Sequence, residues 1–135
     1  MSEKSLVLVK PDGVRRGLVG EILSRFERKG FVIEALQMRT LDKQTADQHY
    51  AEHVEKGWYP ELREFITSGP LVSLVISGDK AVEVIRLLVG ATDARAAAPG
   101  TIRGDLGLSN QANLIHASDS LESAAREIAL FFPEL

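Results

Sequence analysis

Short apolar runs alternate with amphipathic stretches along the chain. The first run, SLVLVK at residues 5–10, is continuous and rich in Val and Leu, which is typical of a buried strand. Pro11, Asp12 and Gly13 follow this run and predict a turn. Further apolar runs predict three more strands, over residues 31–38, 71–76 and 113–115.

Apolar residues at helical spacing predict helices in the intervals between these strands. Gly30 and Gly90 are placed to end two of the helices, and Asp79 to cap the start of the second. Asp119 or Ser120 is predicted to cap the last helix. The stripe of this last helix that is predicted to be buried consists of Leu121, Ala124, Ile128 and Phe131. The predicted helices cover residues 17–29, about 40–56, 60–69, about 80–89 and about 120–131.

Without the small extra helices, the order of elements is βαββαβ followed by one more helix. This order predicts the ferredoxin-like arrangement of the α+β class, a four-stranded antiparallel sheet with helices on one face, plus a C-terminal helix. The length of 135 residues fits one domain, so residues 1–135 are expected to form a single domain. The order of elements says nothing about function.

Composition narrows the class of protein. Apolar residues make up 44% and charged residues 26%, the balance of a folded globular domain. The formal charge of −3 argues against bulk binding of nucleic acid. The lack of cysteine excludes thiol catalysis, disulfides and Cys-ligated metal sites. No apolar run reaches the ~18–20 residues needed to cross a bilayer, and no signal peptide is evident, so a cytoplasmic protein is expected.

Residues 91–112 form a long segment with little periodicity. Structureless loops of more than ~12–15 residues in compact domains are usually functional or mobile. The segment is rich in side chains that can hydrogen-bond to an anion. They are Thr92, Arg95, Arg103, Asp105, Ser109 and Asn110.

His116 is the strongest candidate for chemistry. It follows a predicted strand and precedes Ala-Ser-Asp-Ser, which predicts the start of a helix, where phosphate is favoured. Histidine can form a covalent intermediate, although a core or capping role explains the position equally well. Asn113 and His116 would face opposite sides of a regular strand. If both reach one ligand, the strand must break at or before His116.

Three other charged residues each allow two interpretations. Lys10 ends a strand, where it can reach a ligand or simply be exposed. Arg86 lies in an apolar helix and is expected to be partly buried, beside either a ligand anion or a structural carboxylate. Glu127, in the helix after His116, can fix the tautomer of a histidine ring or lie exposed on the helix surface.

His49 and His53 are four residues apart on a predicted helix, which allows a metal pair. The metalloprotease pattern requires Glu directly after the first histidine, and Tyr50 stands there instead. A solvated polar helix face is the favoured interpretation. The chain also lacks both common glycine-rich phosphate motifs and the nucleophile-elbow motif.

Several segments together resemble the nucleoside diphosphate kinase family. Residues 113–120 (NLIHASDS) resemble its active-site signature, and residues 6–13 (LVLVKPDG) its first strand and turn. Residues 99–105 (PGTIRGD) are similar to its loop, and residues 122–128 (ESAAREI) to the helix that follows the signature. The resemblance extends from about Ser5 to Pro133 with the motifs in the same order, which makes coincidence a poor explanation.

The resemblance implies that His116 accepts the γ-phosphate of a nucleoside triphosphate and passes it to a nucleoside diphosphate in a ping-pong mechanism. Low base selectivity fits an aromatic platform, because every base has a π-face. The implied roles are phosphate contacts from Lys10, Arg86, Thr92 and Arg103, support from Tyr50, base stacking by Trp58, ribose binding by Asn113, and orientation of the His116 ring by Glu127 and Ser118. Ala117, Trp58 and Leu106 depart from the residues usual in the family, without removing a group that the mechanism needs.

The same resemblance implies partners. ATP and other nucleoside tri- and diphosphates are the expected ligands, with Mg²⁺ carried by their phosphates and no metal ligand expected from the protein. The family implies a homo-oligomer, with a hexamer favoured over a tetramer, and neither membrane nor nucleic acid is required. The alternative function is a non-catalytic, ferredoxin-like regulatory domain that binds a nucleotide without turning it over.

Overall fold

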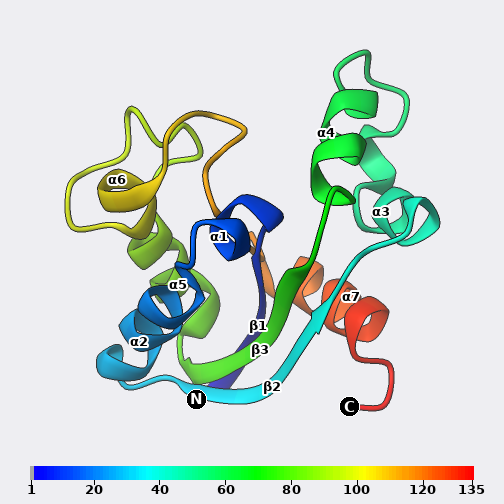
Figure 1. Cartoon of the computed structure of the whole chain (residues 1–135). Helices are drawn as coiled ribbons and strands as arrows, with labels where there is room; N and C mark the ends of the chain where they lie inside the picture. Colours follow the sequence, from blue (N-terminus) through cyan, green and yellow to red (C-terminus); the bar gives the residue numbers. More distant parts are fainter. Residues whose placement is uncertain (1) are drawn as a thin grey trace.

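The computed structural model describes residues 2–135 and arranges them around one sheet (Figure 1). The strands are β1 (Ser2–Val9), β2 (Val32–Arg39), β3 (Leu71–Asp79) and β4 (Ile115–Ala117). The helices are α1 (Pro11–Arg15), α2 (Val19–Lys29), α3 (Lys43–His49), α4 (Tyr59–Ile66), α5 (Ala81–Val89), α6 (Ile102–Leu106) and α7 (Leu121–Phe131), with a 3₁₀ turn at Ala51–His53. None of these helices is long and apolar enough to cross a membrane.

The sheet has the strand order β2-β3-β1-β4, and all neighbouring strands are antiparallel. This topology confirms the predicted ferredoxin-like fold. The central strand β1 pairs along its full length with β3, and its last residues pair with the short strand β4. In that register His116 lies opposite Leu8, which brings it close to the end of β1 at Val9.

Helices cover both faces of the sheet, which corrects the prediction that they lie on one face (Figure 1). Val7 and Val9 of β1 belong to a core with α2 and α5, whereas Leu6 and Leu8 belong to a second core with α3, α4 and α7. The physical reason is the continuous apolar run of β1. Adjacent strand residues point to opposite faces, so both faces need a cover.

Several predicted helix ends are found where the sequence places them, but the helix predicted over residues 40–56 is divided into α3 and the 3₁₀ turn, and α4 ends at Ile66 and not at Gly69. Gly30 ends α2 with a φ of 106°, a conformation that glycine adopts without strain. Ser120 caps α7, because its side chain accepts a hydrogen bond from the backbone N–H of Ser123. The prediction for α5 is wrong: Asp79 ends β3, and Lys80, with a φ of 50°, stands at the cap position.

Three further local predictions need correction. Pro11 starts the helix α1 instead of a simple turn, since proline fits the first position of a helix. The predicted strand over residues 113–115 is shifted to residues 115–117, because Leu114 has a φ of 74° and interrupts it. Leu121 is exposed at the start of α7, and the buried positions of that helix are Ala124, Glu127 and Phe131.

Candidate active site

A cleft of about 560 Å³ opens at the ends of β1 and β4. Its walls come from the segment of α3 and α4 on one side and from α5 and the loop before β4 on the other. Every residue that the sequence predicts for the site lines this cleft except Ser118, which is fully buried behind it. The lining residues predicted from the sequence are Lys10, Tyr50, Trp58, Arg86, Thr92, Arg103, Asn113, His116 and Glu127.

The predicted break in the strand before His116 is present at Leu114. Its positive φ is fixed by two long-range hydrogen bonds: the Leu114 N–H donates to Asp12 Oδ2 at 3.1 Å, and the Lys10 N–H donates to the Leu114 carbonyl at 2.8 Å. Non-glycine residues rarely adopt this conformation, so the surrounding contacts must hold it. The break allows Asn113 and His116 to line the same cleft.

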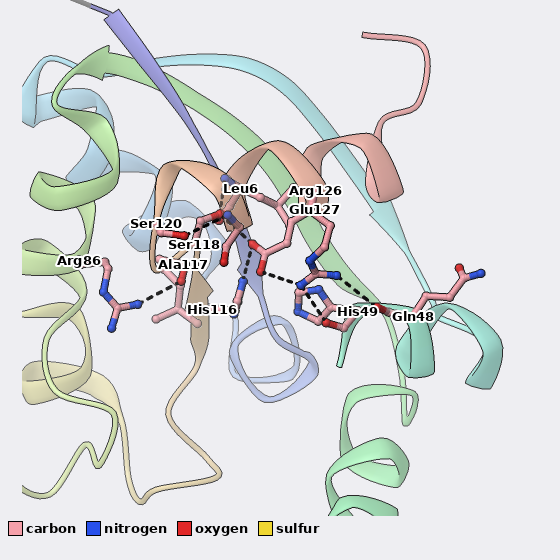
Figure 2. A network of polar contacts seen from close by, with 12 residues as sticks. Leu6, Gln48, His49, Arg86, His116, Ala117, Ser118, Ser120, Arg126 and Glu127 are labelled. Carbon is pink, nitrogen blue, oxygen red and sulfur yellow. Dashed lines mark hydrogen bonds and ion pairs between the residues drawn. The ribbon is translucent and has the colours of Figure 1, made fainter. Parts of the chain in front are cut away.

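The His116 ring is held from one side by a buried carboxylate (Figure 2). Its Nε2 lies 3.0 Å from Glu127 Oε1, which also accepts a 2.7 Å hydrogen bond from Ser118 Oγ. Burial raises the pKa of Glu127, but the hydrogen bonds with His116 and Ser118 and the charge of His116 outweigh it, so the net pKa is lowered. A carboxylate only accepts hydrogen bonds, so the proton between the two groups belongs to Nε2.

The other ring nitrogen of His116 is therefore the one with a free lone pair. Among residues 2–135, no hydrogen bond reaches its Nδ1, and the side chain keeps a 21% exposed fraction at the cleft. A neutral imidazole with a fixed tautomer and a free nitrogen can act as a nucleophile or as a metal ligand.

Lys10 and Arg103 bring two buried cations to the same place. Lys10 Nζ donates a 2.7 Å hydrogen bond to Asn113 Oδ1, and burial, followed by the charge of Arg103, lowers the pKa of Lys10 to about 8. Arg103 donates to the carbonyls of Gly90, Asn113 and Ile115 at 3.1, 3.4 and 2.6 Å. Burial, with a contribution from Arg86, lowers its pKa to about 10. The charge of buried Asp12 acts on the pKa of Lys10 in the opposite direction but does not outweigh these effects. Two nearby buried cations beside one carboxylate favour an anionic ligand.

Arg86 is exposed, which corrects the expectation that it is partly buried. Helix α5 buries Ala81, Val82, Ile85 and Val89, so position 86 falls beside this stripe and not within it. Its guanidinium donates to the Ala117 carbonyl at 3.3 Å, next to His116 (Figure 2). The remaining N–H groups of Arg86 are available to a ligand in the cleft.

Asn113 connects the long loop over residues 91–112 to the floor of the cleft. Its side-chain amide donates to the carbonyls of Thr92 and Asn110 at 2.8 and 2.9 Å. Together with the bond from Lys10, this uses both N–H groups and one lone pair of a side chain that is only 2% exposed. Thr92 is exposed at the rim of the cleft.

Aromatic side chains line the opposite end of the cleft. Trp58 has an exposed fraction of 53%, and its ring lies 5.2 Å from that of His53 and 5.3 Å from Lys56 Nζ. The rings of Tyr50 and Tyr59 pack edge-on with centroids 6.1 Å apart. Burial raises the pKa of Tyr50. An exposed indole beside a cleft provides a flat surface for an aromatic ligand.

His49 is a site residue that the sequence analysis missed. It neither pairs with His53 nor lies on a solvated face: its exposed fraction is 4%, and its ring packs edge-on against His116 with centroids 4.7 Å apart. Burial, followed by the charge of His116, lowers its pKa to about 3. The spacing from Ala46, which is buried on the same helix, is the sequence signal that could have found it.

Asp12 is the second residue missed, because it was assigned to a turn. It is buried in α1 and holds Leu114 as described above. Neither the turn nor the helix could have indicated this role, since its partner lies 102 positions away in the sequence.

Comparisons with known proteins agree on one family. The family model described as nucleoside diphosphate kinase matches residues 3–135. The chain is 64% identical to a nucleoside diphosphate kinase of Nocardioides sp. over 135 residues, covering 100% of both chains. It is 61% identical to one of Thermobifida fusca, covering 98% of each.

A solved structure gives the same result. A halophilic nucleoside diphosphate kinase from Halobacterium salinarum, in complex with CDP, superimposes with a TM-score of 0.96 at 48% sequence identity. The similarity covers 99% of this chain and 90% of that chain.

Proposed function

The chain belongs to the nucleoside diphosphate kinase family and transfers the γ-phosphate of a nucleoside triphosphate to a nucleoside diphosphate, and we propose that His116 carries the phosphoryl group between them. The observation that supports this most is the bond between His116 Nε2 and Glu127. It leaves Nδ1 with a lone pair in a side chain that lines the cleft. The regulatory alternative gives no reason for a nucleophile held in this way.

In the first step of this proposal, the lone pair of Nδ1 attacks the γ-phosphorus. The bond from that phosphorus to the oxygen bridging it to the β-phosphate breaks, and the nucleoside diphosphate leaves with the electron pair. Glu127 accepts the hydrogen bond from Nε2–H and stabilises the positive charge that develops on the ring. In the second step, a β-phosphate oxygen of another diphosphate attacks the phosphorus, and the N–P bond breaks.

The cations of the cleft have the role of binding and stabilising phosphates. Arg103 has five N–H donors, and three of them bond to backbone carbonyls. Its other two N–H groups can therefore face the phosphates. Lys10, Arg86 and the Thr92 hydroxyl complete the proposed phosphate contacts at the same end of the cleft. These contacts stabilise charge on the transferring group, which is the main demand of phosphoryl transfer.

Mg²⁺ enters the proposal with the nucleotide. The phosphate contacts are cations and a hydroxyl, a poor donor set for an ion that prefers several oxygen ligands. We therefore place Mg²⁺ on the nucleotide phosphates, where it neutralises part of their charge.

The other end of the cleft would bind the nucleoside. Trp58 is placed to stack on a base, with Tyr50 supporting this end from the segment between α3 and α4. Asn113 lies beside Lys10 at the phosphate end and has one lone pair of Oδ1 left, so it would accept a hydrogen bond from a hydroxyl of the ribose that joins the base to the phosphates. Stacking depends little on the identity of the base, which supports low base selectivity.

The proposal includes a single domain over residues 1–135, a cytoplasmic location beside its nucleotide substrates, and a homo-oligomer, with a hexamer favoured over a tetramer.

One edge of β2 has no partner strand in the described chain, and Val32, Leu36 and Met38 of this strand are exposed. Such an edge favours pairing with a second copy. Light scattering should give six times the chain mass of 14.8 kDa, and four times that mass would favour the tetramer.

Phosphoryl transfer through His116 is tested by incubation with γ-labelled ATP, followed by a chase with an unlabelled diphosphate. The wild type should acquire an acid-labile, alkali-stable label and lose it in the chase. His116→Ala should retain the fold and nucleotide binding but acquire no label. His53→Ala, which removes another histidine of the same cleft, should still be labelled. Phosphate exchange by His116→Ala at near wild-type rate would rule out this mechanism.

A further inference from the structure

His49, His116 and Glu127 bring three possible metal ligands together beside the cleft. One ring nitrogen from each histidine and one carboxylate oxygen all lie within 4.8 Å of one another. Figure 2 shows His49 next to Glu127, on the side of the carboxylate away from Ser118. The three residues come from α3, β4 and α7, so the fold itself assembles them.

The buried ring nitrogens of His49 give an independent reason to expect a ligand at this place. Both of its ring nitrogens are buried, and neither has a hydrogen-bond partner among residues 2–135. An unsatisfied buried polar group is costly and rare in folded proteins. A neutral histidine ring keeps one lone pair that can bind a metal ion.

We propose that these three residues form a binding site for one divalent transition-metal ion of the Zn²⁺ type. Two imidazoles and a carboxylate are a donor set that Zn²⁺, Co²⁺ and Ni²⁺ bind well, whereas Mg²⁺ prefers oxygen ligands alone. The site is therefore distinct from the Mg²⁺ that accompanies the nucleotide phosphates.

The observed distances suit this coordination with one small movement. In a tetrahedral zinc site with bonds of ~2.0–2.1 Å, neighbouring ligand atoms lie about 3.3 Å apart. His116 Nε2 and Glu127 Oε1 are already 3.0 Å apart, so an ion can replace the proton between them. The ring changes tautomer: the Nε2–H bond breaks, the proton is transferred through solvent to Nδ1, and the freed Nε2 lone pair binds the metal while the imidazole stays neutral. The His49 nitrogen lies within 4.8 Å of the other two ligand atoms, so it supplies the third ligand after a shift of up to about 1.5 Å, with water in the fourth position.

Arg126 limits the affinity of the site. Its guanidinium lies 3.7 Å from Glu127 Oε2 and donates to the His49 carbonyl at 3.4 Å, so it places a positive charge beside the ion (Figure 2). Like charges at this distance repel, which favours weak and reversible binding over a permanent structural ion.

Metal binding at this site inhibits phosphoryl transfer. The ion takes both Glu127 and the Nε2 of His116, and the ring proton then lies on Nδ1, which has no free lone pair with which to attack phosphorus. This consequence rests on the proposed role of His116, whereas the binding of the ion does not. The two parts are therefore tested separately.

Binding is measured by calorimetric titration of nucleotide-free protein with Zn²⁺. The wild type should bind one ion per chain. His49→Phe, which keeps a ring for packing, should lower the affinity by more than about tenfold. His53→Phe removes a histidine that bonds to Lys56 instead, and it should leave the affinity unchanged. Arg126→Gln should raise the affinity several-fold.

The ring nitrogens give a test that needs no variant, because the chain has only three histidines. In ring-¹⁵N-labelled wild-type protein, Zn²⁺ should shift one nitrogen each of His49 and His116 and none of His53. Unchanged affinity in His49→Phe, or Zn²⁺ shifts confined to His53, would overturn the proposal.

Inhibition is measured as the rate at which label from Mg²⁺ and γ-labelled ATP enters the protein, with and without Zn²⁺. Zn²⁺ should slow wild-type labelling at saturating Mg²⁺ and nucleotide, and His49→Phe should be less sensitive. If Zn²⁺ binds as predicted but no label enters even without it, the role of His116 fails while the metal site stands. If labelling is normal and Zn²⁺ does not bind, the metal site alone fails.

Discussion

The phosphate end of the cleft and its base end differ in how firmly their side chains are held. At the phosphate end, Lys10, Arg103 and Asn113 are buried, and each hydrogen-bonds to other parts of the chain. At the base end, Trp58 is 53% exposed, and its ring lies beside His53 and Lys56 of its own segment. Charge that develops during a reaction is best stabilised by groups already in place. Stacking on a base tolerates a looser surface.

Removing Glu127 should have the largest effect and should fall on the chemical step. Glu127→Ala leaves His116 Nε2 without its partner, so kcat should fall by about 10²-fold or more, the order found for groups that orient a catalytic histidine. KM should change little. The measurement is the single-turnover rate of phosphoenzyme formation.

Glu61→Ala is the matched control, since Glu61 is a carboxylate at the base end of the same cleft. It should leave the single-turnover rate near that of the wild type. A Glu127→Ala enzyme with normal kcat and raised KM would reverse the assignment of the two ends.

Trp58→Ala should act on binding and not on chemistry. Loss of one stacking surface weakens nucleotide binding by ~1–3 kcal/mol, whereas phosphorylation of His116 at saturating ATP should persist. Trp58→Phe should recover most of the affinity. Trp58 is the only tryptophan, so its fluorescence should respond to ADP, GDP and a pyrimidine diphosphate alike. No response to any of them, with normal affinity in the alanine variant, would remove Trp58 from the site.

Nucleotide binding at the phosphate end should depend on pH through the charge of Lys10. Its pKa is lowered to about 8, so in the free enzyme Lys10 loses its charge as the pH rises through 8. Bound phosphate favours the charged form, so kcat/KM should decline above pH 8, approaching tenfold per pH unit, while kcat persists to higher pH. Lys10→Arg keeps its charge and should flatten the decline. A wild-type kcat/KM that stays constant up to pH 9.5 would contradict this.

Two matched hydroxyl deletions should give the smallest effects and separate the ends most cleanly. Ser118 Oγ and Tyr59 Oη each donate a 2.7 Å hydrogen bond to a carboxylate, Glu127 and Asp47 respectively. Each deletion should lower the free energy of unfolding by about 1–3 kcal/mol. Ser118→Ala should also lower kcat a few-fold, whereas Tyr59→Phe should raise KM a few-fold. Steady-state kinetics with urea unfolding checks both, and equal effects on kcat would remove the distinction.

The periodicity of the sequence was sufficient to predict the order and type of the main elements. Buried runs and helical stripes are local properties, and β1, α2, β3 and α7 follow them closely. Local patterns failed where a distant contact decides the conformation. Leu114 adopts its left-handed conformation because Asp12 and Lys10 hold it, and neither is near it in the sequence.

The site shows the same limit. The family resemblance named residues that the structure brings to one cleft, with Ser118 behind it. It could not indicate that Arg86 is exposed, which depends on which side of α5 packs on the sheet. His49 was missed because its burial depends on β4 and α7, which pack against α3 only in the folded chain.

The most direct test of the account is the identity of the phosphorylated nitrogen. Glu127 holds Nε2 of His116, so the phosphoryl group should be on Nδ1. Ring-¹⁵N-labelled protein, phosphorylated with ATP and studied by ³¹P and ¹⁵N NMR, reports which nitrogen is bonded to phosphorus. We predict coupling between phosphorus and Nδ1 of His116 alone. Coupling to Nε2, or phosphate on any other residue, would contradict the account.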